Sequence, residues 1–415
     1  MKKTENFWWF KMAILGIMLR LILMPITLHP DLWGHSFTAY FFSSEGVFNI
    51  YEYLLSLPPE HPLVLNFGVS DIFIYPPLTY FTLGLFRILV APFTDNNFIP
   101  WLWSNLDNVY EYQGLYRHLL FYKLPYLFFD IGIAFMLSSL FSDKKQKIKA
   151  FAFWMFNPLT IYATFMIGQL DILPTFFVVL SLYFVKKQKP NLAVVSLGIG
   201  GAYKLYPLLL LPLAAFYLSG KFLSRFKLIL LGLTPFVITI LPFLGSSAFR
   251  SMVLFSPKSQ KMLFMGLNVT AAEVVYPFVL LLFVLYFLVY YQRHRVSLNG
   301  LYLAALLLIF SVSHFHPQWF VWASPLLIWF LVKNNFYMWE LVAVIFISWL
   351  VLTFLFEPSL SFGLFNPLFP KILQAKPLDK ILSHYIDVFM VKSIVRSIFA
   401  ASSFYISLKA IYEKS

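Results

Sequence analysis

The chain has 415 residues, of which 60% are hydrophobic, 20% aromatic and only 12% charged. This composition is too apolar for a soluble protein with one core, so it indicates a polytopic membrane protein. The net charge of +13 does not indicate nucleic-acid binding, because the basic residues gather in short loops between apolar runs. The absence of cysteine excludes disulfides, thiolate metal sites and a cysteine nucleophile.

Apolar runs of about twenty residues predict a bundle of about twelve membrane-spanning helices. The first run carries Arg20 and has no small-residue cleavage site, which favours a retained helix over a signal peptide. With this count, basic loops such as residues 143–149 all fall on one side, and both termini are cytoplasmic. The predicted spans are residues 8–28, 118–141, 150–167, 170–186, 191–207, 208–222, 228–244, 274–291, 298–316, 319–333, 337–356 and 386–410.

Three stretches between these spans are long enough to form extracytoplasmic loops: residues 29–115, 245–273 and 357–384. A full span within the first loop would move the basic residues 143–149 outside, against the positive-inside rule. We therefore expect residues 72–92 to form an interfacial or re-entrant helix with Pro76 and Pro77 in its first turn. No internal repeat is visible, so residues 1–415 are predicted to form a single membrane domain.

Asp31 follows the first predicted span and is flanked by His29 and His35. A half-buried carboxylate at that place is well positioned to accept a proton from a hydroxyl group, as a general base does. The alternative is that Asp31 caps an interfacial helix that begins at Leu32.

The hairpin GQLD at residues 168–171 places the amide of Gln169 and the carboxylate of Asp171 on the same face of the membrane. Asp171 is also a conventional N-cap for the next helix. Lys204 lies near the outer end of a span, where a lysine is costly unless it reaches the lipid headgroups or meets an anion. Asp130 lies in mid-span, which favours a structural ion pair over catalysis.

Two histidines and three further cations lie on the outer face. His314 and His316 are two residues apart, so they do not share a helix face and a histidine-only metal site is disfavoured. Either imidazole can instead donate a hydrogen bond to a phosphate or a hydroxyl group. Arg250, Lys258 and Lys261 are disfavoured outside by the positive-inside rule, which indicates an anionic partner or lipid headgroups. The tryptophans at span ends, including Trp319 and Trp322, are typical of the interfacial belt.

These motifs occur in the order found in the GT-C superfamily of multi-pass glycosyltransferases. YPPLTY at residues 75–80 resembles a stretch of the lumenal dolichyl-phosphate-glucose glucosyltransferases, as do Asn157-Pro158 and GQLD. KLYP at residues 204–207 is similar to an element of the GPI mannosyltransferase catalytic subunit, and prokaryotic relatives share such motifs. The chain departs from the glucosyltransferases at residues 315–317, where FHP replaces the acid and base of their VHEK motif.

The resemblance implies an all-α bundle of GT-C type and an inverting hexosyltransferase of the plasma membrane with an extracytoplasmic active site. It implies transfer of mannose or glucose from a polyprenyl-phosphate sugar to a glycan, lipid or protein acceptor, with Asp31 as general base. The implied partners are this donor, the acceptor and membrane lipids, without nucleic acid, and no metal cofactor is expected. The donor phosphate would be bound by Lys204, Arg250, His314 and His316, and the sugar or acceptor by His35, Gln169 and Asp171.

Two other classes of protein remain open. A flippase or other transporter of lipid-linked sugars would hold cations along a path through the membrane, but it is expected to show pseudo-repeats and broken helices. A non-catalytic scaffold or lipid-binding subunit would keep the apolar helices without requiring Asp31 as a base. The enzyme hypothesis requires Asp31, Gln169, Lys204 and His314 to converge on one cavity.

Overall fold

The computed structural model describes residues 7–68, 72–313 and 316–413, and in this part of the chain the regular elements are helices apart from one short β-hairpin. In the hairpin, strand β1 (Leu267–Asn268) pairs antiparallel with β2 (Val274–Val275). The prediction of an all-α membrane protein is confirmed at this level. The bundle consists of α1 (Phe7–Ile26), α8 (Leu115–Lys123), α9 (Tyr126–Ser139), α10 (Lys144–Met155), α11 (Pro158–Thr160), α12 (Ile172–Lys186), α13 (Pro190–Gly201), α14 (Tyr206–Leu218), α15 (Phe222–Ile240), α17 (Pro277–Gln292), α18 (Leu298–Val312), α19 (Ser324–Lys333), α20 (Trp339–Phe354) and α22 (Val388–Ile411).

Shorter elements connect the bundle helices. The remaining α-helices are α2 (Asp31–Ser44), α3 (Ile50–Ser56), α4 (Pro62–Phe67), α6 (Pro77–Val90), α7 (Phe98–Leu102), α16 (Ser247–Phe249) and α21 (Leu378–Leu382). Two π-helical turns are η3 (Ile161–Met166) and η5 (Arg250–Leu254). The 3₁₀ turns are η1 (Ala91–Phe93), η2 (Leu106–Glu111), η4 (Leu241–Phe243), η6 (Pro257–Leu263), η7 (Pro317–Trp322), η8 (Pro358–Leu360), η9 (Phe362–Phe365) and η10 (Pro370–Gln374).

The number of membrane spans differs from the prediction. In the described part of the chain, four helical stretches are long and apolar enough to cross a membrane: Trp9–Ile26, Leu115–Ser139, Phe222–Phe243 and Val388–Ile411. The other apolar helices have 10–17 residues, fewer than the roughly 20 that ~30 Å of hydrocarbon requires. The predicted count of twelve is therefore not confirmed. One reason lies at Asn157-Pro158, where the predicted span 150–167 divides into α10, α11 and η3.

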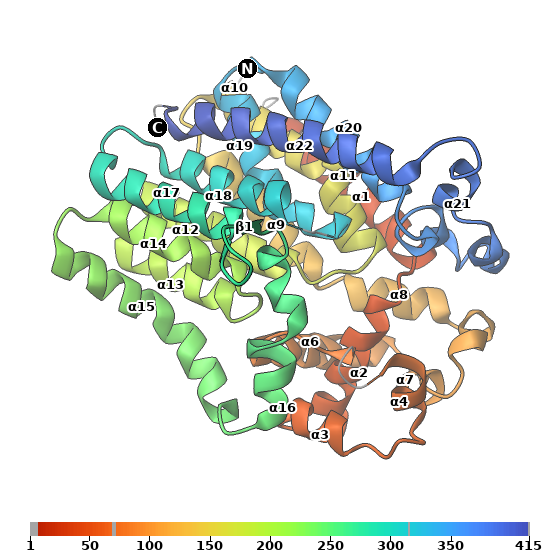
Figure 1. Ribbon diagram of the computed structural model, residues 1–415. Helices are drawn as coiled ribbons and strands as arrows, with labels where there is room; N and C mark the ends of the chain where they lie inside the picture. The colour runs from red at the N-terminus through yellow and green to blue at the C-terminus, as the bar shows by residue number, and fades with distance from the viewer. Residues whose placement is uncertain (1–6, 69–71, 314–315, 414–415) are drawn as a thin grey trace.

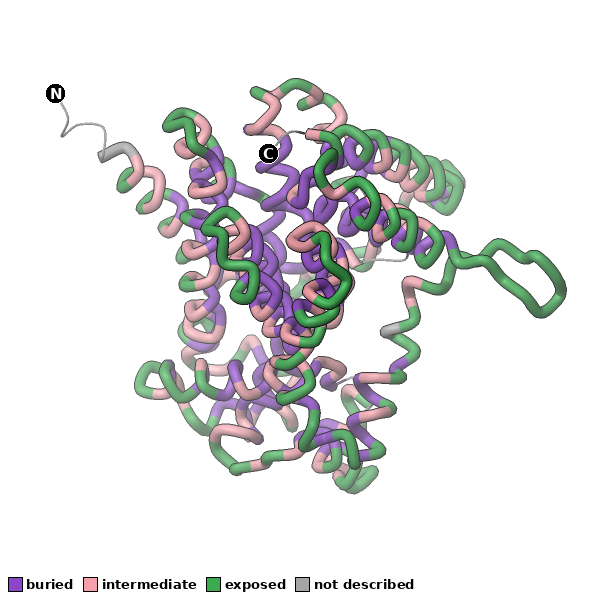
Figure 2. Tube along the Cα trace, turned by 90° about the vertical axis from the view of Figure 1, so that its left-hand side faces the viewer, coloured by how far each residue is buried: buried purple, intermediate pink, exposed green. Residues whose placement is uncertain are grey.

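The first-loop helices form a layer below the bundle. Figure 1 shows α2, α3, α4, α6 and α7 gathered at one end of the molecule, together with α16. The layer has its own aromatic core, separate from the core of the bundle, and Figure 2 shows buried residues in both. This core includes Phe37, Phe41, Tyr51, Tyr80, Phe98, Phe243 and Phe249. Burial of these large apolar side chains stabilises a folded layer rather than an open loop.

Helix α6 has the start that was predicted for it. Pro76 is its N-cap and Pro77 its first residue, where a proline lacks only an N–H that has no partner within the helix. Helix α6 packs along α2, and Thr79 Oγ1 donates to the carbonyl oxygen of Tyr203 at 3.1 Å. The lower layer is therefore tied to the end of α13, close to Lys204.

Helices of the bundle interior approach each other closely at glycines. α18 is buried along nearly its whole length and packs against α22. A Cβ added to Gly300 would lie 1.9 Å from the carbonyl oxygen of Ala410. Small residues allow this kind of backbone contact between membrane helices, and a side chain here would force α18 and α22 apart.

Basic residues gather at the end of the bundle opposite the lower layer. Lys186 Nζ donates to the carbonyl oxygen of Ser139 at 2.7 Å and lies within electrostatic reach of Lys147, Lys187 and Lys333. These lysines come from three of the loops that the positive-inside rule assigns to one side. The structure thus brings three of the basic loops together at one end.

Candidate functional site

A polar cavity of about 540 Å³ lies where the bundle meets the lower layer. Its lining comes from widely separated parts of the chain: the start of α2, the segment before α6, and the turns η6, η7 and η8. Its polar and charged lining residues are His29, Asp31, His35, Tyr75, Lys258, Lys261, His316, Gln318 and Glu357.

Asp31 is the first residue of α2, but it does not cap the helix with its side chain. The N-cap is Pro30, and the backbone N–H of Asp31 donates to Nδ1 of His29 at 3.2 Å. The side chain of Asp31 is 45% exposed and faces the cavity. The alternative that Asp31 is a helix cap is therefore wrong, because its carboxylate makes no capping bond.

Gln169 meets Asp31 from the hairpin that follows the π-helical turn η3. Gly168 supplies the turn with φ +85°, where a side chain would be strained and its Cβ would lie 3.0 Å from Cδ1 of Leu32. Gln169 is almost completely buried, and its Nε2 group donates to the carboxylate of Asp31. Its Oε1 atom is buried and has no hydrogen-bond partner within the protein.

Asp171 and Lys204 form a buried ion pair beside the cavity. Lys204 Nζ lies 2.7 Å from Oδ1 of Asp171, and Nε1 of Trp322 donates to the same oxygen at 2.6 Å. The ammonium group also lies 5.3 Å from the ring centroid of Tyr75 and 5.0 Å from that of Trp319.

The structure tests both sequence-based alternatives for this pair. Asp171 is the N-cap residue of α12, as predicted, but its side chain makes no capping bond and instead pairs with Lys204. Lys204 does not extend to lipid headgroups, since its ammonium group pairs with the buried Asp171.

Lys261 and His316 lie on another side of the same cavity. Lys261 Nζ is 2.8 Å from Nε2 of His316 and 5.4 Å from the ring centroid of Trp319. Burial lowers the pKa of the Lys261 ammonium group, and the nearby charges of Lys258 and Lys204 lower it further. An anion would relieve this repulsion. His314, predicted to act with His316, lies outside the described residues.

Arg250 is not at the cavity, contrary to the prediction that it binds the same group as Lys204. It begins the π-helical turn η5, and its Nη1 donates to the carbonyl oxygen of Leu244 at 2.7 Å. The preceding residues Ala248 and Phe249 are buried in the core of the lower layer. Their packing turns the arginine outward, where it satisfies a backbone carbonyl.

His29 and His35 are held in the neutral form. Burial lowers the pKa of His35 to about 4, and burial likewise lowers that of His29. Nδ1 of His35 has no hydrogen-bond partner within the protein. At neutral pH these side chains are therefore uncharged hydrogen-bonding groups, and the positive charge of the cavity comes from the lysines.

Lys123 positions two segments of the site, and the sequence analysis did not identify it as a candidate residue. It is completely buried, and its ammonium group donates to the carbonyl oxygens of Met24 at 3.0 Å, Thr27 at 2.6 Å and Met166 at 3.0 Å. These carbonyls lie at the ends of α1 and η3, just before Asp31 and Gln169 respectively. A cation at two helix C-termini holds both segments in place. The only sequence signal was a lysine near the start of a predicted span.

Two further predictions concern residues near the site. The structural ion pair expected for Asp130 is confirmed: its partner is Arg20, with Nε and Oδ2 2.7 Å apart. Trp322 was assigned to the interfacial belt, but it is buried and donates to Asp171. Glu357, which lines the cavity, was not predicted as a site residue.

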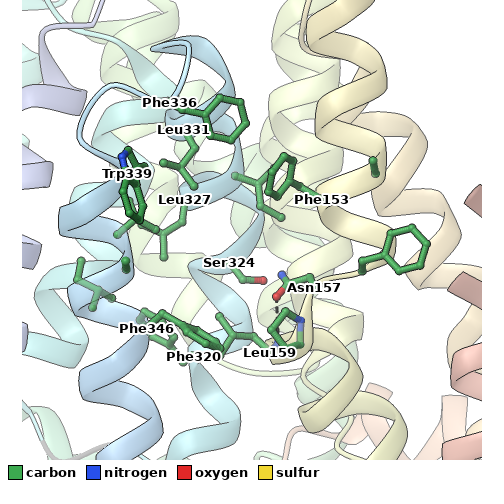
Figure 3. Close-up of a pocket in the computed structure, with 17 residues that line it drawn as sticks. Phe153, Asn157, Leu159, Phe320, Ser324, Leu327, Leu331, Phe336, Trp339 and Phe346 are labelled. Carbon is green, nitrogen blue, oxygen red and sulfur yellow. Dashed lines mark hydrogen bonds between the residues drawn. The ribbon is translucent and has the colours of Figure 1, made fainter.

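A second cavity of about 680 Å³ lies in the bundle and is almost entirely apolar (Figure 3). Figure 3 shows Phe153, Leu327 and Trp339 lining it, with Asn157 and Ser324 among them. Both polar side chains are satisfied locally, because Asn157 accepts from the backbone of Leu159 and Ser324 donates to that of Val321. Turn η7 contributes Phe320 to this cavity and Trp319 to the polar one.

Comparison with known proteins gives one family match. Residues 111–263 match the family described as GPI transamidase subunit PIG-U. No curated protein matches the chain. The matched segment contains Lys123, Gln169, Asp171, Lys204, Lys258 and Lys261, which build much of the site. The remaining site residues, including Asp31, His316 and Glu357, lie outside it.

This match overturns the functional predictions made from the sequence. The matching family consists of membrane proteins described as subunits of a GPI transamidase, not as sugar-transferring enzymes or flippases. The prediction of an inverting hexosyltransferase and the flippase alternative are therefore both wrong, and so is the predicted polyprenyl-phosphate sugar donor. The motifs were misleading because they mark the positions of helices and hairpins, which a scaffold shares with an enzyme. Among the residues described, no group of three or more His, Asp or Glu side chains is placed to hold a metal ion.

Proposed function

We propose that this chain is a membrane subunit of a transamidase-type complex and that its polar cavity holds the phosphate-bearing headgroup of a GPI-type glycolipid. The observation that carries the proposal is that the segment matching the GPI transamidase subunit family includes Lys204 and Lys261. Both lysines flank the ring of Trp319 at the cavity, together with His316.

The chemistry of the cavity supports a phosphate ligand. Lys261 and Lys258 bring positive charge to a half-buried cavity, where an anion is attracted more strongly than in water. Oε1 of Gln318, which lines the cavity, is a buried acceptor without a partner in the protein, and a hydroxyl group of a sugar or inositol can donate to it. Phosphate and hydroxyl groups together are the features of a phosphoglycolipid headgroup.

The apolar cavity supports a lipid rather than a soluble ligand. It lies on the other side of η7 from the polar cavity and offers about 680 Å³ of apolar space. An acyl chain fills such a space without leaving polar groups unpaired. We propose that hydrocarbon occupies it when the protein is in a membrane.

The transamidation step is assigned to a partner subunit. This chain has no cysteine, so it provides no thiol nucleophile, and Asp31 is held by the amide of Gln169. We propose that the chain keeps a scaffold resembling the GT-C type as a single membrane domain. We also propose an orientation in the membrane. Both termini are cytoplasmic, and the polar cavity and the three long loops face the opposite side.

The experiment is to purify the chain in nanodiscs and measure binding of a GPI-type glycolipid by native mass spectrometry, with phosphatidylcholine as the reference lipid. We expect preferential binding by the wild type, reduced about tenfold in Lys261→Gln because one charge-assisted contact is lost. Arg250→Gln removes the same charge outside the cavity and is expected to bind as the wild type does. Equal binding of both lipids, or an equal loss in the two variants, would contradict the proposal.

A further inference from the structure

Arg87 of α6 is a buried cation in the lower layer. The residue is 8% exposed, and its Cζ atom lies 4.8 Å from the ring centroid of Tyr40. Nη1 donates to Oγ of Ser43 at 3.2 Å and to Oγ of Ser44 at 2.5 Å, and Nη2 donates to Oδ1 of Asn96 at 3.3 Å. All of these partners are uncharged, so they leave the positive charge of Arg87 without compensation.

No carboxylate neutralises this charge in the described part of the chain. No ion pair there joins Arg87 to an aspartate or glutamate. The two acids that follow or precede its partners in the sequence are engaged elsewhere. Glu45 accepts a hydrogen bond from the hydroxyl group of Tyr53 at 3.2 Å, and Asp95 accepts one from that of Tyr112 at 2.6 Å.

The other titratable groups near Arg87 do not supply a negative charge either. Tyr40, Tyr122 and His118 lie within its electrostatic reach, and none of these side chains is an anion at neutral pH. Burial of a charge without a counter-ion costs free energy. An anion bound beside Arg87 would offset this cost.

Two N–H groups of the Arg87 guanidinium are free to bind such an anion. Nε makes no hydrogen bond to another described residue, and Nη2 uses only one of its two N–H groups, toward Asn96. Nε is not enclosed by the protein, because Arg87 lines a crevice between α2, α6, α8 and α9. Nε and Nη2 are adjacent donors, an arrangement that binds two oxygens of one phosphate or carboxylate group.

The crevice beside Arg87 is narrow and largely apolar. Its lining includes Leu83 and Phe86 of α6 and Phe121 of α8, and its volume of about 30 Å³ has room for a small group but not for a whole lipid. His35 lines both this crevice and the polar cavity, but no described lysine lines the crevice. Arg87 is therefore a source of positive charge separate from the lysines of the polar cavity.

The outer face of α6 favours a lipid as the source of the anion. Leu85, Ile88 and Leu89 of this helix and Phe93 of η1 are large apolar side chains that are exposed. Helix α6 lies in the part of the lower layer that faces the bundle (Figure 1). Exposed apolar surface of this kind marks contact with a membrane. A lipid whose acyl chains cover this surface can place its phosphate group at Arg87.

We propose that Arg87 binds the phosphate group of a membrane phospholipid through Nε and Nη2, while the acyl chains of this lipid cover the outer face of α6. The site is separate from the polar cavity and does not rest on the proposed function. The phosphate supplies the negative charge that the protein does not provide. A neutral lipid with the same acyl chains would leave Arg87 uncompensated.

The test places a fluorescent reporter beside the site. The chain has no cysteine, so Leu89→Cys, at an exposed position of α6, can be labelled alone with bimane. In maltoside micelles, quenching is titrated with phosphatidylglycerol or with diacylglycerol, each carrying a nitroxide on one acyl chain. We expect phosphatidylglycerol to quench at an about tenfold lower concentration, as one charge-assisted contact would give. Equal quenching by the two lipids would overturn the proposal.

Three arginine variants, each made in the labelled chain, identify the group that binds the phosphate. Arg87→Gln is expected to remove the preference for phosphatidylglycerol, and Arg87→Lys, which keeps the charge but not the paired donors, is expected to reduce it. Arg117→Gln removes the same charge at an exposed position of α8 and is expected to retain the preference. A full preference in Arg87→Lys would overturn the two-point contact, and this holds even where Arg87→Gln does not fold.

Two further arms separate this site from other sources of the signal. Competition by glycerol phosphate at the affinity of the lipid would assign the site to a soluble phosphate ester and overturn the lipid source. Lys261→Gln changes the polar cavity and is expected to leave the quenching unchanged, whether or not the proposed function is correct. Loss of the preference in Lys261→Gln would show that the reporter detects the polar cavity and would overturn a separate site.

Discussion

The Nε2 group of Gln169 donates a hydrogen bond to the carboxylate of Asp31, and the two residues are 138 positions apart in the chain. The contact joins the start of the lower layer to a hairpin of the bundle. Gln169→Leu removes the donor and leaves the carboxylate without this partner, so we expect a loss of about 1–3 kcal/mol in the free energy of unfolding. Denaturant titration in detergent measures it. Gln169→Glu, which places a second carboxylate beside Asp31, is expected to lose more; a smaller loss would contradict this account.

The buried pair of Lys204 and Asp171 gives the largest expected effect on stability. Lys204→Met leaves Asp171 with an uncompensated charge beside Trp322, and removing one partner of a buried ion pair costs about 3–5 kcal/mol. Thermal unfolding followed by circular dichroism measures the change. Lys227→Met, at an exposed position of α15, is expected to stay within about 0.5 kcal/mol of the wild type. Similar losses in the two variants would show that Lys204 is not paired as described.

Lys123 is expected to control the geometry of the site. Lys123→Met leaves the carbonyls of Met24, Thr27 and Met166 without their donor, which we expect to cost about 3 kcal/mol and to loosen both segments of the site. Lys123→Arg keeps the positive charge but changes where it lies, so it tests whether the position of the charge matters. We expect it to fold but to bind the phosphoglycolipid more weakly. Native affinity in Lys123→Arg would show that the exact placement of this cation does not matter.

Stability is expected to fall as the pH falls from about 6.5 to 4. Burial lowers the pKa of folded His35 from its ordinary value of 6.5 to about 4, so in this interval the unfolded chain binds more protons. The folded state is at its full stability above pH 6.5, and the loss of stability due to His35 reaches about 3 kcal/mol by pH 4. His35→Asn is expected to weaken this pH dependence and to leave the part due to His29, whose pKa burial also lowers. His294→Asn, at an exposed position, is expected to retain it in full. Denaturant titrations at each pH measure the free energy of unfolding of the two variants. An unchanged pH dependence in His35→Asn would contradict this prediction.

The apolar cavity is expected to hold one lipid chain. Ala343→Trp places a large side chain into this space and is expected to reduce the number of lipids retained after detergent extraction by one. Quantitative lipid mass spectrometry counts them. Ala401→Trp, exposed on α22, adds the same side chain elsewhere and is expected to leave the count unchanged. Loss of a lipid in both variants would contradict the proposal that the apolar cavity holds a lipid chain.

The sequence predicted the helical class and several site residues because both depend on local physical chemistry. A run of apolar residues defines a membrane helix, and a charged residue at its end, such as Asp31 or Lys204, is conspicuous because burial of charge is costly. The start of α6 could be predicted from its two proline residues for the same reason, since their effect on the backbone is local.

The remaining features depend on contacts between distant segments. Lys123 acts through the carbonyl groups of Met24 and Met166, which no spacing in the sequence reveals. Trp322 looked like an interfacial tryptophan, and only the packing of η7 against Asp171 makes it a buried donor. Arg250 looked like a ligand-binding cation, but the packing of the lower layer directs it to a backbone carbonyl. The function was missed because the motifs describe the scaffold, which is common to proteins with different activities.

The most direct test of the central claim is photo-crosslinking from inside the polar cavity. A photoreactive phenylalanine analogue replaces Ile74, which lines the cavity, and adducts formed in native membranes are identified by mass spectrometry. The same analogue at the exposed Tyr337, outside this cavity, is the control. We predict an adduct at position 74 that contains inositol, phosphate and a lipid chain, and that is absent from the control. An adduct of a polyprenyl phosphate, or the same lipids at both positions, would contradict the account.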